Sequence, residues 1–287
     1  MCSRGWFDHV AQRWCPVCAP VDTGAGTVQH PITELPARVE FSRIVDLTHA
    51  LGPDFPTYSG APELGFDVLR SYDRDRKNVK RWVIQEHIGT HIDAPIHFSE
   101  RARTVDQIPV DSLIVPLAVI DISERAQDNP DAELTPDDVV AFEAHYGPIA
   151  AGCCVAMNSG WDRYANGRRF RNADDAGTMH FPGVHVEAAM LLHDRGVGGV
   201  GVDTMSIDHG RSTEFPTHYA WLPSNKWAIE GLANLAALPP TGATIFVGAP
   251  KVKGQPVVLV ESSPCCDSGW AAARRPIADF RPSLQVV

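Results

Sequence analysis

The 287-residue sequence contains no apolar stretch approaching the roughly 18 residues that a membrane-spanning helix requires. It also lacks long basic runs, because the paired arginines Arg168-Arg169 and Arg274-Arg275 are the longest that stand out. The formal net charge is −10, from 25 Lys and Arg against 35 Asp and Glu. Nucleic acids and anionic membranes attract clustered Lys and Arg, so we expect neither as a partner.

The first twenty residues lack a continuous apolar segment, so we expect no ordinary secretory signal and a cytoplasmic protein. Among seven cysteines, Cys15 and Cys18 form a C-x-x-C pair, but no second pair and no βαβ pattern accompany it. We interpret the thiols as structural or incidental. A redox role, a minor metal role or a disulfide for Cys15 and Cys18 are the alternatives. Two further pairs are Cys153-Cys154, in an apolar strand, and Cys265-Cys266, in a Ser/Pro-rich tail.

Three histidines and an aspartate are concentrated in residues 87–97, which read HIGTHIDAPIH. In an ideal strand, rising about 3.3 Å per residue, His87 and Asp93 would lie roughly 20 Å apart, too far to share an ion. A helix is disfavoured by Gly89, by Pro95 and by the β-branched residues Ile88, Thr90 and Ile92. We therefore expect a strand over residues 81–86, then a loop bent near Gly89 and Pro95. Such a loop can direct all four polar side chains at one centre.

Any one of these histidines alone could be an ordinary loop residue or a hydrogen-bonded core residue. Three of the chain's 12 histidines within eleven residues, beside an aspartate, instead indicate a metal site. Imidazole and carboxylate ligands suit Zn²⁺ or Mn²⁺, and no thiolate is needed.

This segment resembles the His-x-Gly-Thr-His-x-Asp-x-Pro-x-His signature of the cyclase family of metal-dependent hydrolases, which includes bacterial kynurenine formamidases and isatin hydrolases. Residues 46–48, Pro53 and residues 55–60 resemble the family's amino-terminal segment, and residues 201–208 its strand-end motif. His218 and Glu230 have the twelve-residue separation of the family's distal metal ligands. The resemblance covers roughly residues 43–262.

The resemblance implies that His87, His91 and Asp93 hold a first metal, and that Asp93, His218 and Glu230 complete a second or shared site. One or two ions are therefore possible. For the distal pair, the alternatives are a helix-entry histidine at His218 and a surface glutamate on a helix over residues 227–235.

His97 would be the proton donor and acceptor. A bound metal lowers the pKa of water from about 15.7 to about 7 and polarises a carbonyl oxygen. An imidazole with an ordinary pKa of about 6.5 can take that proton and return it to a leaving amine. The products would be a carboxylate and a free amine.

Aromatic residues could form a flat substrate pocket near the metal. The candidates are Phe55, Tyr58, Phe98, Trp161, Trp221 and Trp227, each of which could equally be a core residue apart from Tyr58, which lies in the motif. Kynurenine formamidases usually carry Trp at that position, so Tyr58 favours an isatin-hydrolase-like substrate. Ser206 is a further candidate for binding substrate. Ser206 and Asp208 could also orient a ligand histidine, with capping or turn roles equally open.

The expected function is hydrolysis of a C–N amide bond in a small aromatic substrate, with an isatin-type cyclic amide opened to its carboxylate. Hydrolysis of N-formylkynurenine by an arylformamidase is the alternative. A non-catalytic metal-binding or ligand-binding protein is a second alternative, and a thiol redox protein a third.

Alternating elements predict an α/β fold. Expected strands span residues 46–51, 113–122, 153–158 and 197–202, and residues 244–247 and 256–260 make a final pair. Thr135 and Pro136 start a helix that runs to about Tyr146, and residues 185–195 form another, closed by Gly196. Residues 164–175 read as a long polar loop.

The resemblance implies a single domain with a mixed sheet and flanking helices, associated as a homodimer or homotetramer. We assign this domain to residues 41–287. Residues 1–40 show no clean periodicity and read as an amino-terminal extension.

Overall fold

The computed structural model describes residues 41–266. The expected amino-terminal extension, with Cys15 and Cys18, lies outside this range. In the part of the chain that is described, no helix is long and apolar enough to cross a membrane.

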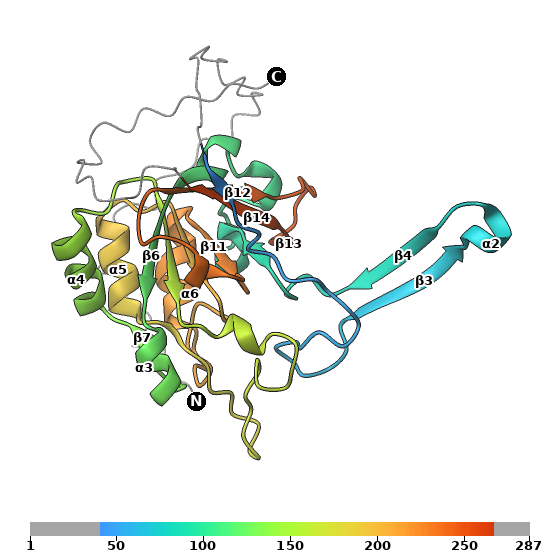
Figure 1. Ribbon diagram of the computed structural model, residues 1–287, viewed down its shortest axis with the longest axis horizontal. Helices are drawn as coiled ribbons and strands as arrows, with labels where there is room; N and C mark the ends of the chain where they lie inside the picture. Colours follow the sequence, from blue (N-terminus) through green and yellow to red (C-terminus); the bar gives the residue numbers. More distant parts are fainter. Residues whose placement is uncertain (1–40, 267–287) are drawn as a thin grey trace, which may run out of the picture. The chain divides into compact units, whose positions relative to one another are not determined.

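A nine-stranded mixed sheet forms the centre of the fold (Figure 1). Its strand order is β13-β5-β11-β10-β8-β6-β12-β14-β2. Four central strands, β11, β10, β8 and β6, run parallel, and the strands on both sides pair antiparallel. The bounds are β2 (Arg43–Ile44), β5 (His91–Asp93), β6 (Ile114–Asp121), β8 (Cys154–Asn158), β10 (Gly199–Val202), β11 (Trp227–Glu230), β12 (Ala243–Gly248), β13 (Val257–Leu259) and β14 (Glu261–Cys266). The expected α/β fold with a mixed sheet is confirmed.

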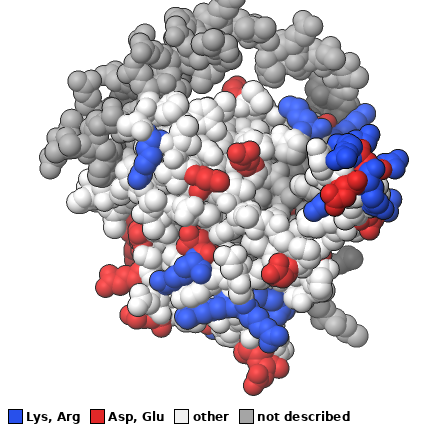
Figure 2. Space-filling view, turned by 45° about the vertical axis from the view of Figure 1, so that its right-hand side comes forward, with Lys and Arg blue, Asp and Glu red and all other residues white. Residues whose placement is uncertain are grey.

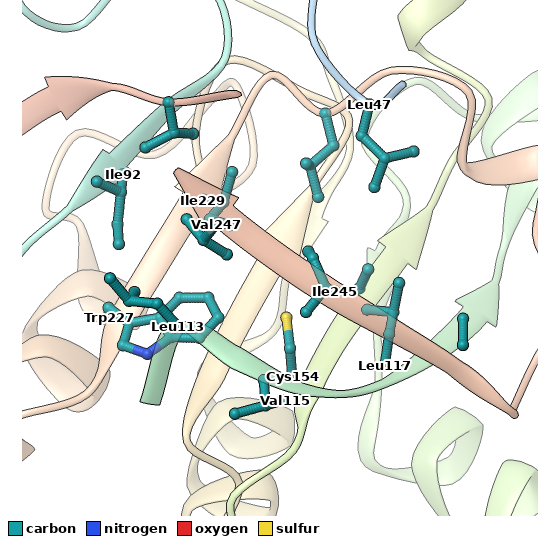
Figure 3. Packing of buried hydrophobic residues seen from close by; sticks show 14 of the residues in the cluster. Leu47, Ile92, Leu113, Val115, Leu117, Cys154, Trp227, Ile229, Ile245 and Val247 are labelled. Carbon is teal, nitrogen blue, oxygen red and sulfur yellow. The ribbon is translucent and has the colours of Figure 1, made fainter. Parts of the chain in front are cut away.

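Apolar residues cover both faces of the central strands, because successive side chains of a strand point to opposite faces. On β6, Leu117 and Val119 join the cluster shown in Figure 3, while Ala118 and Ile120 join a second cluster on the other face. Helices α4 (Pro136–Tyr146) and α5 (Val186–Asp194) cover the second cluster. Short 3-10 helices contribute to the first: η2 (Val105–Gln107), η3 (Val110–Leu113) and η6 (Leu235–Ala237). The sheet is therefore buried on both sides.

The remaining elements are short. They are α3 (Ser123–Asp128), α6 (Pro216–Trp221), η1 (Pro95–Phe98), η4 (Asp162–Tyr164) and η5 (Leu222–Ser224), with β7 (Glu133–Leu134) paired to β9 (Gly183–Val184). The two predicted helices are present: Thr135 caps α4 by accepting from the Asp138 backbone N–H, and Gly196 follows α5 with φ +75°.

Several sequence-based expectations about the sheet were wrong. Residues 46–51 form no strand, although Leu47 N–H still donates to the Ser262 carbonyl. The segments near 244–247 and 256–260 do not pair with each other: β12 pairs with β6 and β14, whereas β13 pairs with β5. The tail that includes Cys265 and Cys266 is strand β14. Local sequence cannot specify these pairings, because they join segments distant along the chain.

A long hairpin extends from the sheet-containing body (Figure 1). It consists of β3 (Leu64–Arg70), the one-turn helix α2 (Tyr72–Asp75) and β4 (Val79–Ile84), and we call residues 64–84 the arm. Only the two strand ends, Leu64 and Ile84, join a core cluster. Most of the arm is exposed, including Trp82 at 61% and Val83 at 62%.

Candidate active site

The bend predicted for residues 87–97 is present. Gly89 takes φ +63°, and a Cβ there would lie 2.3 Å from the Leu51 side chain. His91 and Asp93 then enter the short strand β5, and Pro95 begins the 3-10 turn η1, which carries His97. The three histidines and Asp93 are thereby folded around one centre instead of lying along an extended strand.

Strand pairing brings in Glu230 from a distant part of the chain. In the antiparallel ladder of β5 and β11, His91 lies opposite Glu230. The alternative of a surface glutamate on a helix over residues 227–235 was wrong, because residues 227–230 are a fully buried strand and Glu230 is 3% exposed. Gly231 follows with φ +65°, and a Cβ there would lie 2.5 Å from the Gly89 carbonyl oxygen. The two glycines allow the two loops to meet.

Four potential ligand residues form the first group: His87, His91, Asp93 and Glu230. His87 Nδ1 and His91 Nε2 each lie 3.5 Å from Asp93 Oδ1, and His91 Nε2 lies 3.3 Å from Glu230 Oε2. Ligand atoms about 2.1 Å from one ion in tetrahedral geometry are roughly 3.4 Å apart. The spacing of this group therefore matches a single coordination shell.

A second group consists of Asp93, His97 and His218, so Asp93 is shared. His218 Nε2 lies 3.5 Å from Asp93 Oδ2 and 3.2 Å from Glu230 Oε1. His97 Nε2 is more distant, at 3.9 Å from Asp93 Oδ2. All six residues assigned by the resemblance to the metal and to proton transfer thus converge, from β5 with its flanking loops, α6 and β11.

The residues fit a metal ion. Both carboxylate oxygens of the fully buried Asp93 lack a hydrogen-bond partner, and leaving a buried charge without one is costly. Imidazole nitrogens and carboxylate oxygens surround it, the donor set of Zn²⁺ and Mn²⁺ sites. A cation among these atoms would supply the interactions that Asp93 lacks.

Two ligand candidates are held in place by neighbouring groups. The Nδ1 atom of His218 lies 2.6 Å from Asp208 Oδ2, and His91 Nδ1 lies 2.9 Å from the Gly89 carbonyl oxygen. With Nδ1 donating to these acceptors, Nε2 of each ring is left for the centre. Asp208 also accepts hydrogen bonds from the backbone N–H groups of Thr217 and His218 at the start of α6. It therefore both caps this helix and orients the His218 imidazole. The Glu230 carboxylate accepts the backbone N–H of Ile207.

Electrostatics divides the histidines into two pairs. Burial lowers the pKa of His87 to about 4 and also lowers the pKa of His97. Burial acts the same way on His91, but the Glu230 and Asp93 carboxylates outweigh it and raise its pKa to about 9. Burial is likewise outweighed at His218, whose pKa the carboxylates of Asp208, Asp93 and Glu230 hold well above its ordinary value. The buried carboxylates therefore attract positive charge into the centre.

A cavity of about 240 Å³ opens on this centre. Tyr58 and Ser206 line it, as expected from sequence. Sequence reasoning missed Ser59, Glu63, Gln85, Phe170 and Met205, which also line it. Glu63 directly precedes β3 and Gln85 directly follows β4. Their approach to the cavity could therefore be predicted only if the hairpin were already known.

Other aromatic candidates lie elsewhere. Trp221 is 1% exposed, donates its indole N–H to the Trp227 carbonyl and packs in a core cluster, so its expected place in the pocket was wrong. Phe55 packs edge-on to Phe170, which lines the cavity, but Phe55 does not line it. Trp161 and Trp227 are also core residues. Phe98 lies against the His218 ring, with centroids 4.6 Å apart.

The sequence and fold match known proteins. A family model described as "Putative cyclase" matches residues 45–209. Isatin hydrolase of Roseibium aggregatum is 33% identical over 235 residues, covering 75% of this chain and 89% of that protein. Kynurenine formamidase of Salinibacter ruber is 26% identical over 199 residues, covering 69% and 85%. A crystal structure of an isatin hydrolase bound to the product analogue thioisatinate superposes with a TM-score of 0.74 at 31% identity, covering 78% of this chain and 92% of that one.

The chain belongs to the cyclase family. It is a metal-dependent hydrolase, in agreement with the buried His, Asp and Glu centre.

Proposed function

We propose that the protein hydrolyses the C–N bond of an isatin-type cyclic amide, opening the ring to a carboxylate and an aromatic amine. The observation that carries the proposal is the convergence of His87, His91, His218 and Glu230 on the unpartnered carboxylate of Asp93, beside a cavity walled by Tyr58. The similarity to isatin hydrolase over three quarters of the chain supports this choice of substrate.

Zn²⁺ or Mn²⁺ is the proposed cofactor. His87, His91, Asp93 and Glu230 would hold one ion, and the second group, which shares Asp93, offers a place for another. The imidazole nitrogens favour Zn²⁺, whereas the two carboxylates suit Mn²⁺ equally well. When bound, such an ion lowers the pKa of a water molecule and polarises a carbonyl oxygen.

His97 is the proposed proton carrier. It lines the cavity, and burial lowers its pKa, so the ring is neutral at neutral pH and can accept a proton at Nε2 from the attacking water. Returning that proton to the amide nitrogen allows the C–N bond to break, and the resulting amine stays attached to the ring-opened product. The neighbouring rings of His87 and Phe98, with centroids 4.4 and 4.7 Å away, restrict the orientation of the imidazole.

Tyr58, Phe170 and Met205 would hold a flat ring, since all three line the cavity. The second candidate substrate is N-formylkynurenine, the formamide expected for an arylformamidase. One observation favours it: Glu63 and Gln85 place a carboxylate and an amide on the cavity wall, where they could bind the ammonium group of an amino acid.

Parallel absorbance assays with isatin and N-formylkynurenine distinguish these candidates. We expect a higher kcat/KM for isatin. The opposite order would identify an arylformamidase. No turnover of either substrate by protein with bound metal would point to another cyclic amide or ester as substrate, or to a non-catalytic metal-binding or ligand-binding protein.

We also propose that the protein is a homo-oligomer, a dimer or tetramer, in which the arm contacts a second copy. A two-stranded hairpin is marginally stable alone, and this one exposes Phe66, Trp82 and Val83. The arm carries six Lys and Arg against three Asp, a net charge of +3. Because the whole chain has a net charge of −10, the residues outside the arm have a net charge of −13. Figure 2 shows Lys and Arg gathered on the side where the arm comes forward.

Replacing Trp82 and Val83 together by Ser is expected to raise the dimer dissociation constant by about a hundredfold, because a buried Trp is typically an interface hot spot. Sedimentation equilibrium measures this change. Val140→Ser, which alters an exposed valine on α4, is the control and should leave the assembly mass unchanged. A wild-type protein with the mass of one chain would contradict the proposal.

The cytoplasm is the proposed location. The four cysteines in residues 41–266 are free and buried, which suits a reducing compartment. Neither nucleic acid nor a membrane is proposed as a partner.

A further inference from the structure

A second cavity, of about 580 Å³, is lined in part by residues of the segment that carries Tyr58. Residues 53–62 form one wall and residues 166–173 the other, and Pro56 lines both this cavity and the metal-side cavity. The volume falls within the range of roughly 300–1,000 Å³ usual for small-molecule sites. We call it the arginine cavity.

Two arginines give this cavity its charge. Arg168 is exposed and its guanidinium makes no hydrogen bond or ion pair with any residue in 41–266. Arg171 is half-buried and uses only Nε, which donates to the Tyr58 carbonyl oxygen at 2.9 Å. Asp54 is the one carboxylate on the wall, and it lies beyond ion-pair distance of both arginines. Two guanidinium groups thus present unused donors in a protein of net charge −10.

Much of the remaining wall is apolar. It includes Pro53, Phe55, Pro56 and Pro62. Guanidinium groups bind carboxylates through paired N–H donors, and proline and phenylalanine surfaces pack against a flat ring. The wall chemistry therefore fits a small aromatic carboxylate better than a free inorganic ion, which would leave the apolar part uncovered.

The arginine cavity is coupled to the metal-side cavity through Arg171. Its guanidinium packs against the backbone of Gly60, where a Cβ would lie 3.3 Å from Nε, and it donates to Tyr58, whose side chain lines the metal-side cavity. An anion held by Arg171 would therefore act on the segment that positions Tyr58.

From these contacts we infer that the arginine cavity is a second binding site, selective for an aromatic carboxylate. Its occupant belongs to the chemical class of the reaction product, and that part of the inference rests on the proposed function. The site would keep product bound, or would change the position of Tyr58 when product accumulates.

Calorimetric titration with benzoate tests the site directly, using the full chain both metal-loaded and after chelation. We expect benzoate to bind in both states, and the neutral isostere benzamide to bind at least about tenfold more weakly. Arg168→Gln should weaken benzoate binding by about tenfold or more. Arg169→Gln is the matched control, because the Arg169 guanidinium lies over the Tyr164 ring, 4.1 Å from its centroid, and does not line the cavity.

Three results would overturn the inference: unchanged benzoate binding in Arg168→Gln, equal binding of benzoate and benzamide, or binding that disappears with the metal. The last would place benzoate at the metal centre. None of these readouts requires turnover, so a failure of the proposed amide hydrolysis would remain distinguishable. If hydrolysis is observed, the carboxylate product should show a non-competitive inhibition component that Arg168→Gln removes and Arg169→Gln retains.

Discussion

Asp93→Asn is expected to abolish tight metal binding and to lower kcat/KM by about a thousandfold or more. Asp93 belongs to both potential ligand groups, and its two oxygens lie 3.5–3.9 Å from four imidazole nitrogens without a hydrogen-bond partner of their own. The neutral Asn side chain lacks the negative charge that attracts the cation. Losing several kcal/mol of metal-derived transition-state stabilisation corresponds to that fall in rate.

Metal content of the purified variant, by mass spectrometry, and the hydrolysis rate measure these effects. Asp111→Asn provides the matched control, because it makes the same substitution at an exposed residue of η3. Far-UV circular dichroism establishes that both variants are folded. A folded Asp93→Asn protein with a full complement of metal and wild-type activity would show that this carboxylate is not a ligand.

His97→Gln is expected to retain metal but to lower kcat by about a hundredfold to ten-thousandfold, the usual contribution of a positioned general acid or base. The amide side chain preserves polarity but cannot carry the proton between water and the leaving nitrogen. In the wild-type protein, His97 Nε2 lies farther from the Asp93 carboxylate than the nearest nitrogen of each of the other three histidines. This larger distance favours proton transfer over metal coordination as the role of His97.

Stopped-flow rates and metal content should be measured on the same preparation. His145→Gln, at an exposed position of α4, is the control and should behave as wild type. Loss of metal from His97→Gln would instead assign His97 to the second ligand group. Full activity would remove it from the mechanism.

The local part of the site could be predicted from the sequence. The geometric conflict between an extended strand and a shared ion requires a bend in residues 87–97, and the structure places it at Gly89. His218 and Glu230 were reached only through the resemblance, because their approach depends on the pairing of β11 with β5 and on the turn held by Asp208.

Other features could not be derived from local pattern. Trp221 and Tyr58 were both candidates for the substrate pocket, yet one fills the core and the other lines the cavity, a difference set by tertiary packing. Glu63 and Gln85 reach the cavity because they flank an arm that projects from the sheet-containing body. The expected strand over residues 46–51 is absent, although the Leu47 backbone N–H donates to the Ser262 carbonyl.

The most direct test of metal-dependent amide hydrolysis is turnover by chelator-treated protein resupplied in turn with Zn²⁺ and Mn²⁺, assayed on isatin and N-formylkynurenine. We predict that activity is lost on chelation and restored by at least one ion, with isatin as the better substrate. Undiminished turnover by protein that contains no measurable metal would contradict the account.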